Sequence, residues 1–534
     1  MSDEKQYEAA SVEVQEECNR VDDVSDVGVK EEDSKCAAPP PPTSLKKNAV
    51  YNLISKLLTL LIPLITTPYL ARVLGEEGNG QISYVSSIIT YFGLIASLGF
   101  SVYGQREIAK YRNDKNAKSK VFWEIFIMKL LCTIVSLSIL LILIFTVGFG
   151  ERYNQLMLIM SLQVVAVLFD IEYLYMGEEN FKSIALRNII VRAIGVILIF
   201  IFVKTENDAW VYTLYLSLSA IMSYFIMWAG LARHVSLISL RTLKPWHHLK
   251  SALIIFLPIV ITSLFTTFDK TMIGLLSANP DYDNGCYEQA YKINSVAQTV
   301  VTVFSSVMMS RNAADYKSGN IEAMNDHISK SARYVWLTSL FLIAGFITLS
   351  DNFSSWFLGE GYIEVPLLLQ IMSIRLLVSG FSVIFGDRFI AMGKEKWWLI
   401  SVTVGAVANI GINYWLIPIY GAIGAAVATA VCEVMILVAM SVLTFRSKGL
   451  PWKPIVLPCW KYLIAASGMF GIMFLMQFFL PNAVWTFLII GAAGTVIYIS
   501  VLFLLRDAFF VGLLKSFFSK LKIRQKEGRN GKDS

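Results

Sequence analysis

Charged and amide side chains inside long apolar stretches are the residues of this sequence that could do chemistry. Asp269 and Lys270 are adjacent, and Lys292 and Gln298 follow in the next stretch. An ionised group in hydrocarbon is costly, so each of these is a candidate functional residue by default. Adjacent helical residues point about 100° apart, so Asp269 and Lys270 cannot face the same partner. Asp269 could take up a proton or a coupling cation, and Lys270 could bind an anionic substrate. The alternative is an internal structural network that includes Lys292.

Other charged residues also lie within apolar stretches. Arg375 has no acidic residue nearby in its own stretch, so it requires a partner elsewhere. Asp170 and Glu172 could hold a coupling cation, although pairing with Arg192 is the preferred interpretation. Structural pairing is the interpretation we favour for a whole set of residues, namely Lys129, Asp170, Glu172, Arg192 and Glu433. A further pair of amides lies one helical turn apart and could line a cavity or bond across helices: Asn409 and Asn413.

The stretches that hold these residues predict membrane-spanning helices. The chain has 534 residues, of which 55% are hydrophobic and 16% are charged, whereas roughly 25% of a soluble domain is charged. The apolar stretches have about the 20 residues that cross a bilayer as a helix, and they are too continuously apolar for barrel strands. We therefore expect an all-α, polytopic membrane protein with about 14 spans. Their ranges are 48–71, 80–103, 121–147, 155–176, 186–203, 210–231, 251–276, 287–312, 333–350, 366–391, 398–418, 421–445, 461–480 and 483–505.

Lys and Arg gather in the loops on one side of these spans. The loops after the second, sixth and twelfth spans are basic, as is the end of the chain. Short cytosolic loops carry the excess of Lys and Arg, so we expect both termini to be cytosolic. The polar, acidic residues 1–45 predict a disordered cytosolic tail. Residues 506–534 predict a basic cytosolic tail that lies against anionic lipid.

An internal repeat relates the first two spans to the seventh and eighth. Residues 63–75 and 257–274 each contain a proline, then a Thr-rich stretch and an apolar-Gly step, and a polar span follows each. The offset of six spans is even, so both copies have the same orientation. We expect two pseudo-symmetric six-helix lobes, N-terminal 46–231 and C-terminal 251–445, plus two additional helices in 461–505. The polar spans should line a cavity between the lobes, although Ser and Thr also join helices directly.

Three motifs resemble those of a known family. The runs PLITTPYLARVLG (63–75), YGQREIA (103–109) and TFDKTMIG (267–274) resemble the polysaccharide flippases of the Wzx type. These belong to the superfamily that includes the multidrug and toxic compound extruders. The resemblance implies a flippase of the bacterial inner (plasma) membrane that moves undecaprenyl-diphosphate-linked oligosaccharide repeat units from the cytosolic to the periplasmic leaflet. Alternating access coupled to H+ or Na+ would supply O-antigen, capsule or exopolysaccharide biosynthesis, with the polysaccharide polymerase machinery as a partner.

The resemblance also implies tasks for the cationic residues, because a diphosphate and a hydrated glycan cannot cross about 30 Å of hydrocarbon unaided. Lys56 could contact the diphosphate or extend to the interface. Arg72 could bind headgroup phosphate during release or anchor its helix. Arg106 could meet the incoming diphosphate or serve only as a positive-inside anchor. The full expected lumen set is Lys56, Arg72, Arg106, Lys270, Lys292, Gln298 and Arg375, with Asp269 as the ion-coupling residue.

Two other classes of protein are alternatives to the flippase. The alternative is a cation-coupled small-molecule or multidrug extruder of the related export family, but a net-cationic lumen would repel cationic drugs. An enzyme is not expected, because no connection is long enough for a catalytic domain. There is also no Walker A motif, so we do not expect ATP to be the energy source. We expect membrane lipids as partners and no cofactor, metal site or nucleic acid. His247 and His248 could bind a metal, but we expect them to lie in a solvated loop.

Overall fold

The computed structural model describes residues 45–147, 151–446, 450, 452–480 and 484–515, without the side chains of 45–61, 147, 151, 152 and 484. Residues 1–44 of the expected acidic tail, residues 516–534 of the expected basic tail and the Lys56 side chain therefore lie outside the described residues. Within the described ranges the regular secondary structure is helical.

The first half of the chain forms eight of the helices. They are α2 (Leu45–Ser97), α3 (Phe100–Lys110), α4 (Lys115–Val147), α5 (Glu151–Phe169), α6 (Glu172–Gly177), α7 (Phe181–Phe202), α8 (Ala209–Trp228) and α9 (Leu231–His234). A 3₁₀ turn, η3 (Pro245–His248), then leads into the second half. Its helices are α10 (Leu249–Leu276), α11 (Pro280–Lys317), α12 (Ile321–Leu358), α13 (Val365–Ala391), α14 (Glu395–Arg446), α15 (Trp452–Val456), α16 (Cys459–Phe479) and α17 (Val484–Leu504).

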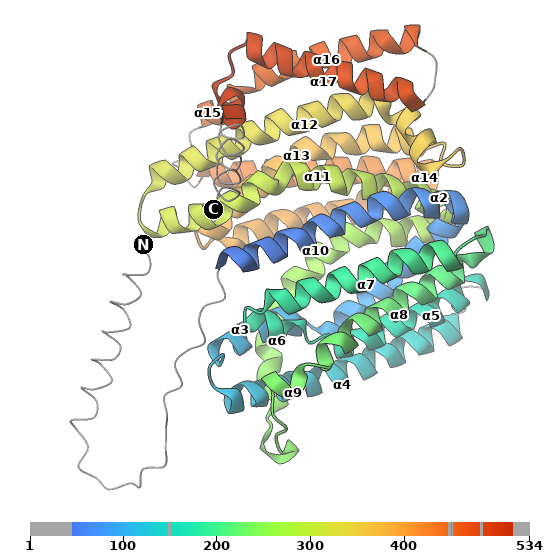
Figure 1. The fold of residues 1–534 in the computed structure, drawn as a ribbon, viewed down its shortest axis with the longest axis vertical. Coiled ribbons are helices and arrows are strands. Elements are labelled where there is room, and N and C mark those ends of the chain that lie inside the picture. The colour runs from blue at the N-terminus through green and yellow to red at the C-terminus, as the bar shows by residue number, and fades with distance from the viewer. Residues whose placement is uncertain (1–44, 148–150, 447–449, 451, 481–483, 516–534) are drawn as a thin grey trace, which may run out of the picture. The chain divides into compact units, whose positions relative to one another are not determined.

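Two of these helices each cross the membrane twice. In the described residues, 12 helices are long and apolar enough to cross. However, α2 has 53 residues and α14 has 52, and at about 1.5 Å per residue each would be more than twice as long as the hydrocarbon core. The chain turns back inside them at Gly75, where φ is 66°, and at Gly421, where φ is 54°. A side chain is strained in this left-handed region, so glycine occupies both turns. The all-helical polytopic fold is confirmed (Figure 1).

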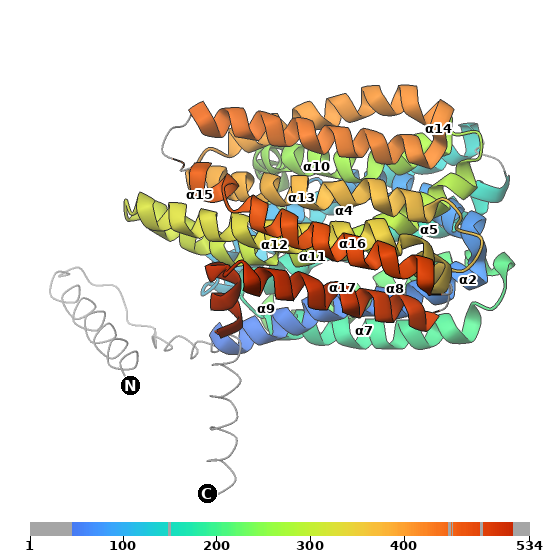
Figure 2. The ribbon, with the colours of Figure 1, turned by 90° about the horizontal axis from the view of Figure 1, so that it is seen from above.

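The helices form two packed groups. In the first helix group, α2 packs on α4, α5 and α7 through apolar clusters, and α3, α6 and α8 complete the contacts. In the second helix group, α10 to α14 pack on one another, and α16 and α17 lie along α12 at the edge of the bundle (Figure 2). We name the two ends of the bundle by their residues: the Gly75 end, which also holds Tyr362, and the His248 end, which also holds Arg106.

Two predicted spans are the middles of longer helices. The ranges 287–312 and 333–350 lie in α11 and α12, which have 38 residues each. The polar ends of both helices continue beyond the apolar stretch, since nothing in their sequence breaks the helix. The Asn320 side chain accepts from the backbone of Ala323 and caps the start of α12.

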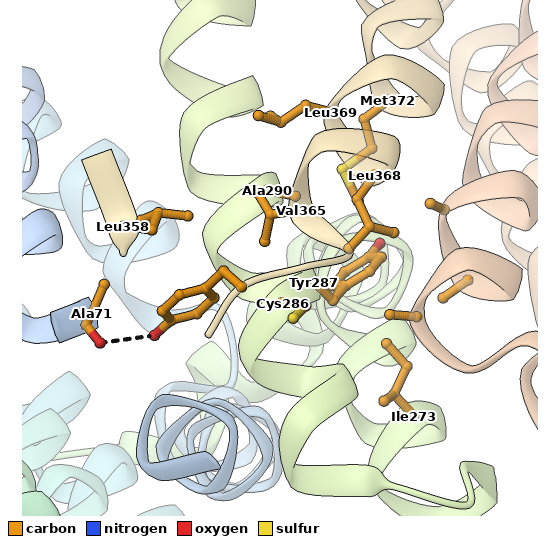
Figure 3. Close-up of a cluster of buried hydrophobic side chains, with 14 of the residues drawn as sticks. Ala71, Ile273, Cys286, Tyr287, Ala290, Leu358, Val365, Leu368, Leu369 and Met372 are labelled. Carbon is orange, nitrogen blue, oxygen red and sulfur yellow. Dashed lines mark hydrogen bonds between the residues drawn. The ribbon is translucent and has the colours of Figure 1, made fainter. Parts of the chain in front are cut away.

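The core of the second helix group reaches across to α2. Ala71 of α2 lies in one cluster with Ile273, Tyr287, Leu358 and Leu368, all of which are buried (Figure 3). Burial of this apolar surface stabilises the contact between the groups, at roughly 25 cal/mol per Å² of apolar area. The turn of α2 that precedes Gly75 is thereby fixed against α12 and α13.

Candidate functional site

Backbone contact between α2 and α11 closes the Gly75 end. A β-carbon on Gly285 would overlap the Glu76 carbonyl, and one on Gly80 would overlap the backbone of Asp281. Only glycine permits helices to approach this closely. The part of α2 that follows Gly75 is therefore held directly against the second helix group.

Hydrogen bonds complete this closure. Asn79 donates to the Tyr362 hydroxyl at 3.1 Å, and that hydroxyl donates to the Gly75 carbonyl at 2.9 Å. Gln81 donates to Asp281 Oδ2 at 3.2 Å. Asn79 and Tyr362 are buried, so these bonds are shielded from water.

Arg72 contributes another link at the same end. Its side chain is exposed, and its guanidinium donates to the Trp356 carbonyl of α12. The residue joins the two helix groups rather than lying in an enclosed cavity. This position is compatible with both tasks expected for it, contact with a headgroup phosphate and anchoring of the helix.

A layer of hydroxyl groups lies beneath the closure. Ser87 lies 2.8 Å from Thr271 of α10, and the Tyr91 hydroxyl lies 2.9 Å from the same oxygen. The Tyr84 ring fills the space that a side chain at Gly274 would need. The α2–α10 contact is therefore polar and close, so at this level the hydroxyl groups join the helices directly, which was the alternative to the expected cavity.

A charged cluster joins α10, α11 and α2. Lys270 pairs with Glu288 Oε2, and Lys292 pairs with Glu288 Oε1 at 3.2 Å. Ser83 of α2 donates to Glu288 Oε2 at 3.3 Å. The Lys270, Glu288 and Lys292 side chains are 17%, 14% and 40% exposed, so the cluster is enclosed on the Glu288 side and open on the Lys292 side.

Tyr291 connects this cluster to a third cation. Lys270 Nζ lies 5.3 Å from the centre of the Tyr291 ring, and the Arg375 guanidinium lies 5.2 Å from the same centre. Arg375 also pairs with Glu433 of α14 at 3.0 Å, so the partner that it requires is found. Two cations thus lie against the Tyr291 ring, and the linked cluster of Lys270, Lys292, Arg375, Glu288 and Glu433 has one more cation than carboxylates.

Asp269 points away from this cluster into the second helix group. Its carboxylate accepts bonds from Tyr287 at 2.5 Å, Thr429 at 2.6 Å and Asn413 at 2.6 Å. Asn413 also donates to Asn409 at 3.1 Å. Asp269 is 2% exposed, and the described residues give it no cationic partner. A buried carboxylate surrounded by amides and hydroxyls can hold a proton or a cation that prefers oxygen ligands.

Gln298 and Arg106 do not join the charged cluster. Both polar atoms of the Gln298 amide are buried, and neither has a partner among the described residues. The next residue of α11, Thr299, is exposed, as is Thr262 of α10. Arg106 is exposed on α3 at the His248 end. The face of α11 that carries Gln298 was expected to line the cavity. The exposed polar residues Thr262 and Thr299 lie beside that face and not on it.

His248 corrects the expectation of a solvated histidine pair. His247 is exposed, but His248 is 5% exposed. Its ring nitrogens lie 2.7 Å from the Tyr103 hydroxyl and 2.7 Å from Glu124 Oε2. The expectation was wrong for His248 because Glu124 of α4 supplies a buried acceptor, which the local sequence around the histidines does not reveal.

Glu172 does not pair with Arg192, the arginine expected from the sequence. Glu172 pairs with Arg187 at 2.9 Å, and Lys129, which is fully buried, donates to the Asp170 carbonyl at 2.6 Å. Asp170 lies where the chain breaks between α5 and α6, so its carbonyl is free of the helical ladder. Pairing for Lys129, Glu172 and Glu433 is confirmed, although the partner expected for Glu172 was wrong.

The helix arrangement and the buried charges between the helix groups define a multi-pass membrane transporter. The fold is similar to that of the lipid II flippase MurJ in an inward closed conformation, with a TM-score of 0.71 and 16% identity over 87% of this chain and 100% of that one. It is also similar to an inward-facing multidrug resistance transporter of the MATE family, with a TM-score of 0.56 and 14% identity over 73% of this chain and 100% of that one.

The sequence comparison identifies the family. Residues 45–310 match the family described as "Polysaccharide biosynthesis protein", and the chain belongs to this family. It is 24% identical over 406 residues to a protein of Escherichia coli (strain K12) named "Putative O-antigen transporter", which covers 74% of this chain and 95% of that protein. The protein is a membrane transporter of polysaccharide biosynthesis and not an enzyme, as the sequence predicts.

Several site residues were missed by reasoning from the sequence. Glu288 carries a signal, because it precedes Lys292 by four residues and such pairs meet on one helix face. Tyr287 and Thr429 carry none, since tyrosines and threonines are common in membrane helices and become partners of Asp269 only through helix packing.

Proposed function

We propose that this protein is a flippase that moves undecaprenyl-diphosphate-linked oligosaccharide repeat units from the cytosolic to the periplasmic leaflet. The observation that carries the proposal is a linked group of three cations. Lys270 and Arg375 contact the Tyr291 ring, and Lys292 shares with Lys270 the Glu288 carboxylate, to which α2 also bonds. Ammonium and guanidinium groups bind phosphate oxygens by charge-assisted hydrogen bonds. A diphosphate that leaves water requires such partners.

The two helix groups supply the alternating access in this proposal. The N-terminal lobe (46–231) and the C-terminal lobe (251–445) rock against each other, and 461–505 adds two helices beside α12. The Gly75 end is the periplasmic side and is closed in this structure, and the exposed polar residues of α10 and α11 lead from the cytosolic side. Both termini lie in the cytosol of a bacterial cell, and the product passes to the polysaccharide polymerase machinery.

The Asp269 cluster is the coupling site in this proposal. Loading of the buried carboxylate with H+ or Na+ neutralises it and changes the bonds that α10 makes to α14 through Asn413 and Thr429. An ion shifts the balance of two conformations only if it binds one of them more tightly. In this proposal the difference comes from the bonds that Asn413 and Thr429 make to Asp269 in the present conformation.

The carboxylates Glu288 and Glu433 support a second candidate, an extruder of small cationic molecules. They reduce the positive charge around Tyr291, so the lumen is less cationic than the sequence predicts. The excess of one cation still favours an anionic substrate.

A complementation experiment tests the proposal. In a host that lacks the gene, wild type should restore surface polysaccharide and remove lipid-linked repeat units that accumulate in the cytosolic leaflet. Lys270→Ala should fail at a normal membrane level. Lys330→Ala is the matched control, because Lys330 is half exposed and pairs only with Asp326 of its own helix. Unchanged polysaccharide together with increased sensitivity to cationic drugs would establish the extruder instead.

A further inference from the structure

Glu288 makes contacts that the proposed function does not explain. Its two carboxylate oxygens are shared by Lys270 of α10, Lys292 of α11 and Ser83 of α2. The side chain is 14% exposed, so these partners account for much of its surroundings. One carboxylate therefore offsets one of the two positive charges of Lys270 and Lys292 and at the same time bonds to the opposite helix group.

We propose that Glu288 is an internal substitute for the diphosphate of the substrate and that the substrate releases α2 by displacing it. This inference rests on the proposed function, because it requires that Lys270 and Lys292 bind the diphosphate. A carboxylate and a phosphoryl group present similar acceptor oxygens to an ammonium group. The diphosphate carries more charge, so it competes effectively for the same two lysines.

The displacement has a mechanical consequence at the Gly75 end. Ser83 lies on α2 only two residues after Gln81, which bonds to Asp281 in the closure. When the diphosphate takes the lysines, Glu288 loses its counter-charges and is repelled by the bound anion. The Ser83 bond is then lost, and one link between the helix groups is removed only when substrate is present. The empty transporter stays closed at the Gly75 end.

Glu433 provides a contrast within the same cluster. It pairs with Arg375 from inside the second helix group and is 6% exposed. It lies on α14 and pairs with α13, so its displacement would not free α2. The coupling between anion binding and opening is thus assigned to Glu288 specifically.

The test uses the full chain in lipid nanodiscs with inorganic pyrophosphate as the probe. Glu288→Gln retains the shape of the side chain and removes the competing charge, so its affinity for pyrophosphate should rise on the order of ten-fold, the effect of one charge-assisted hydrogen bond. Glu178→Gln is the matched control. Glu178 is likewise shared by two basic side chains, Lys118 and His234, but lies at the His248 end. Its loss should leave the affinity for pyrophosphate unchanged.

Hydrogen exchange of residues 76–91 measures the release of α2. In wild type, pyrophosphate should accelerate exchange in this segment. In Ser83→Ala, exchange should be fast without ligand while the affinity stays within about two-fold of wild type, because the lysines and Glu288 are intact. Ser83→Ala removes a single hydroxyl, so it tests the release even if Glu288→Gln does not fold.

The outcomes separate this inference from the proposed function. If wild type does not bind pyrophosphate, the diphosphate site itself is wrong. If wild type binds but Glu288→Gln binds no more tightly, or if pyrophosphate leaves the exchange of 76–91 unchanged, Glu288 is a structural partner only. The flippase proposal would survive both of those results.

Discussion

Asp269 and Lys270 are neighbours in the chain but belong to different networks. The Asp269 carboxylate bonds to Asn413 and Thr429 inside the second helix group, while the Lys270 ammonium pairs with Glu288 on the side of α2. One turn of α10 therefore connects a buried carboxylate to a cluster that touches both helix groups. Asp269 and the lysine that pairs with Glu288 are therefore separated by a single peptide bond.

Replacement of Asp269 should uncouple transport from the ion gradient. Asp269→Asn retains the size of the side chain but cannot be ionised, so it should neither take up a proton nor attract a cation. We expect the acceleration of transport by a Na+ or H+ gradient in proteoliposomes to fall roughly ten-fold or more, within the usual range of coupling free energies. Asp326→Asn, at an exposed ion pair, should retain it. Full coupling in Asp269→Asn would exclude this residue as the coupling site.

Loss of Glu433 should destabilise the protein. Glu433→Gln leaves the Arg375 guanidinium, which is 12% exposed, without its counter-charge. Removal of one partner from a buried ion pair costs about 3 kcal/mol or more. The double replacement Arg375→Met, Glu433→Leu should recover much of this stability, since no buried charge remains. Thermal unfolding in detergent measures both variants, and equal loss in the single and the double variant would contradict the explanation.

A methyl group at Gly285 should open the Gly75 end. The added β-carbon of Gly285→Ala would overlap the Glu76 carbonyl, and backbone atoms cannot move aside as a flexible side chain can. Overpacking of this kind costs about 1–3 kcal/mol, so the closed form should be less populated. Faster hydrogen exchange in residues 76–91 is the expected result. Gly345→Ala is the control, because its nearest neighbour would be Met469 at 4.0 Å; equal exchange in both variants would argue against a closure at Gly285.

Acid should weaken the anchor at Glu178. Burial alone would raise the pKa of this carboxyl, but hydrogen bonds and charge from His234 and Lys118 lower it below the ordinary value of 4.5. A depressed pKa stabilises the folded protein above the ordinary pKa, and the contribution is lost as pH falls through the folded pKa. Wild type should therefore unfold at a higher temperature than Glu178→Gln at neutral pH. The difference should shrink as the pH falls below 4.5 and vanish once the pH is below the lowered pKa of the folded protein. A difference that persists in stronger acid would have another origin.

The positions of the helices could be predicted from the sequence, but most partners of the charged residues could not. Apolar length is a one-dimensional property, so the ranges around Asp269 and Arg375 follow from composition alone. The partner of Arg375, Glu433, lies 58 residues away, and only the relative rotation of α13 and α14 brings them together. Rotation also explains Gln298, whose amide is enclosed while the next residue is exposed. A periodic pattern identifies the polar face of a helix to within one residue. It does not identify the helix that packs against that face.

The turns at Gly75 and Gly421 have a consequence for anyone who engineers this protein. Each reverses the chain at a glycine with non-helical backbone angles that joins two helices directly, and a β-carbon at Gly421 would overlap the Asp283 carboxylate. These two reversals offer no loop that a protease could cut and no surface segment that could accept an epitope tag or a reporter fusion. Tags that map the topology will succeed only in the other connections. We therefore expect insertions at Gly75 and Gly421 to be poorly tolerated.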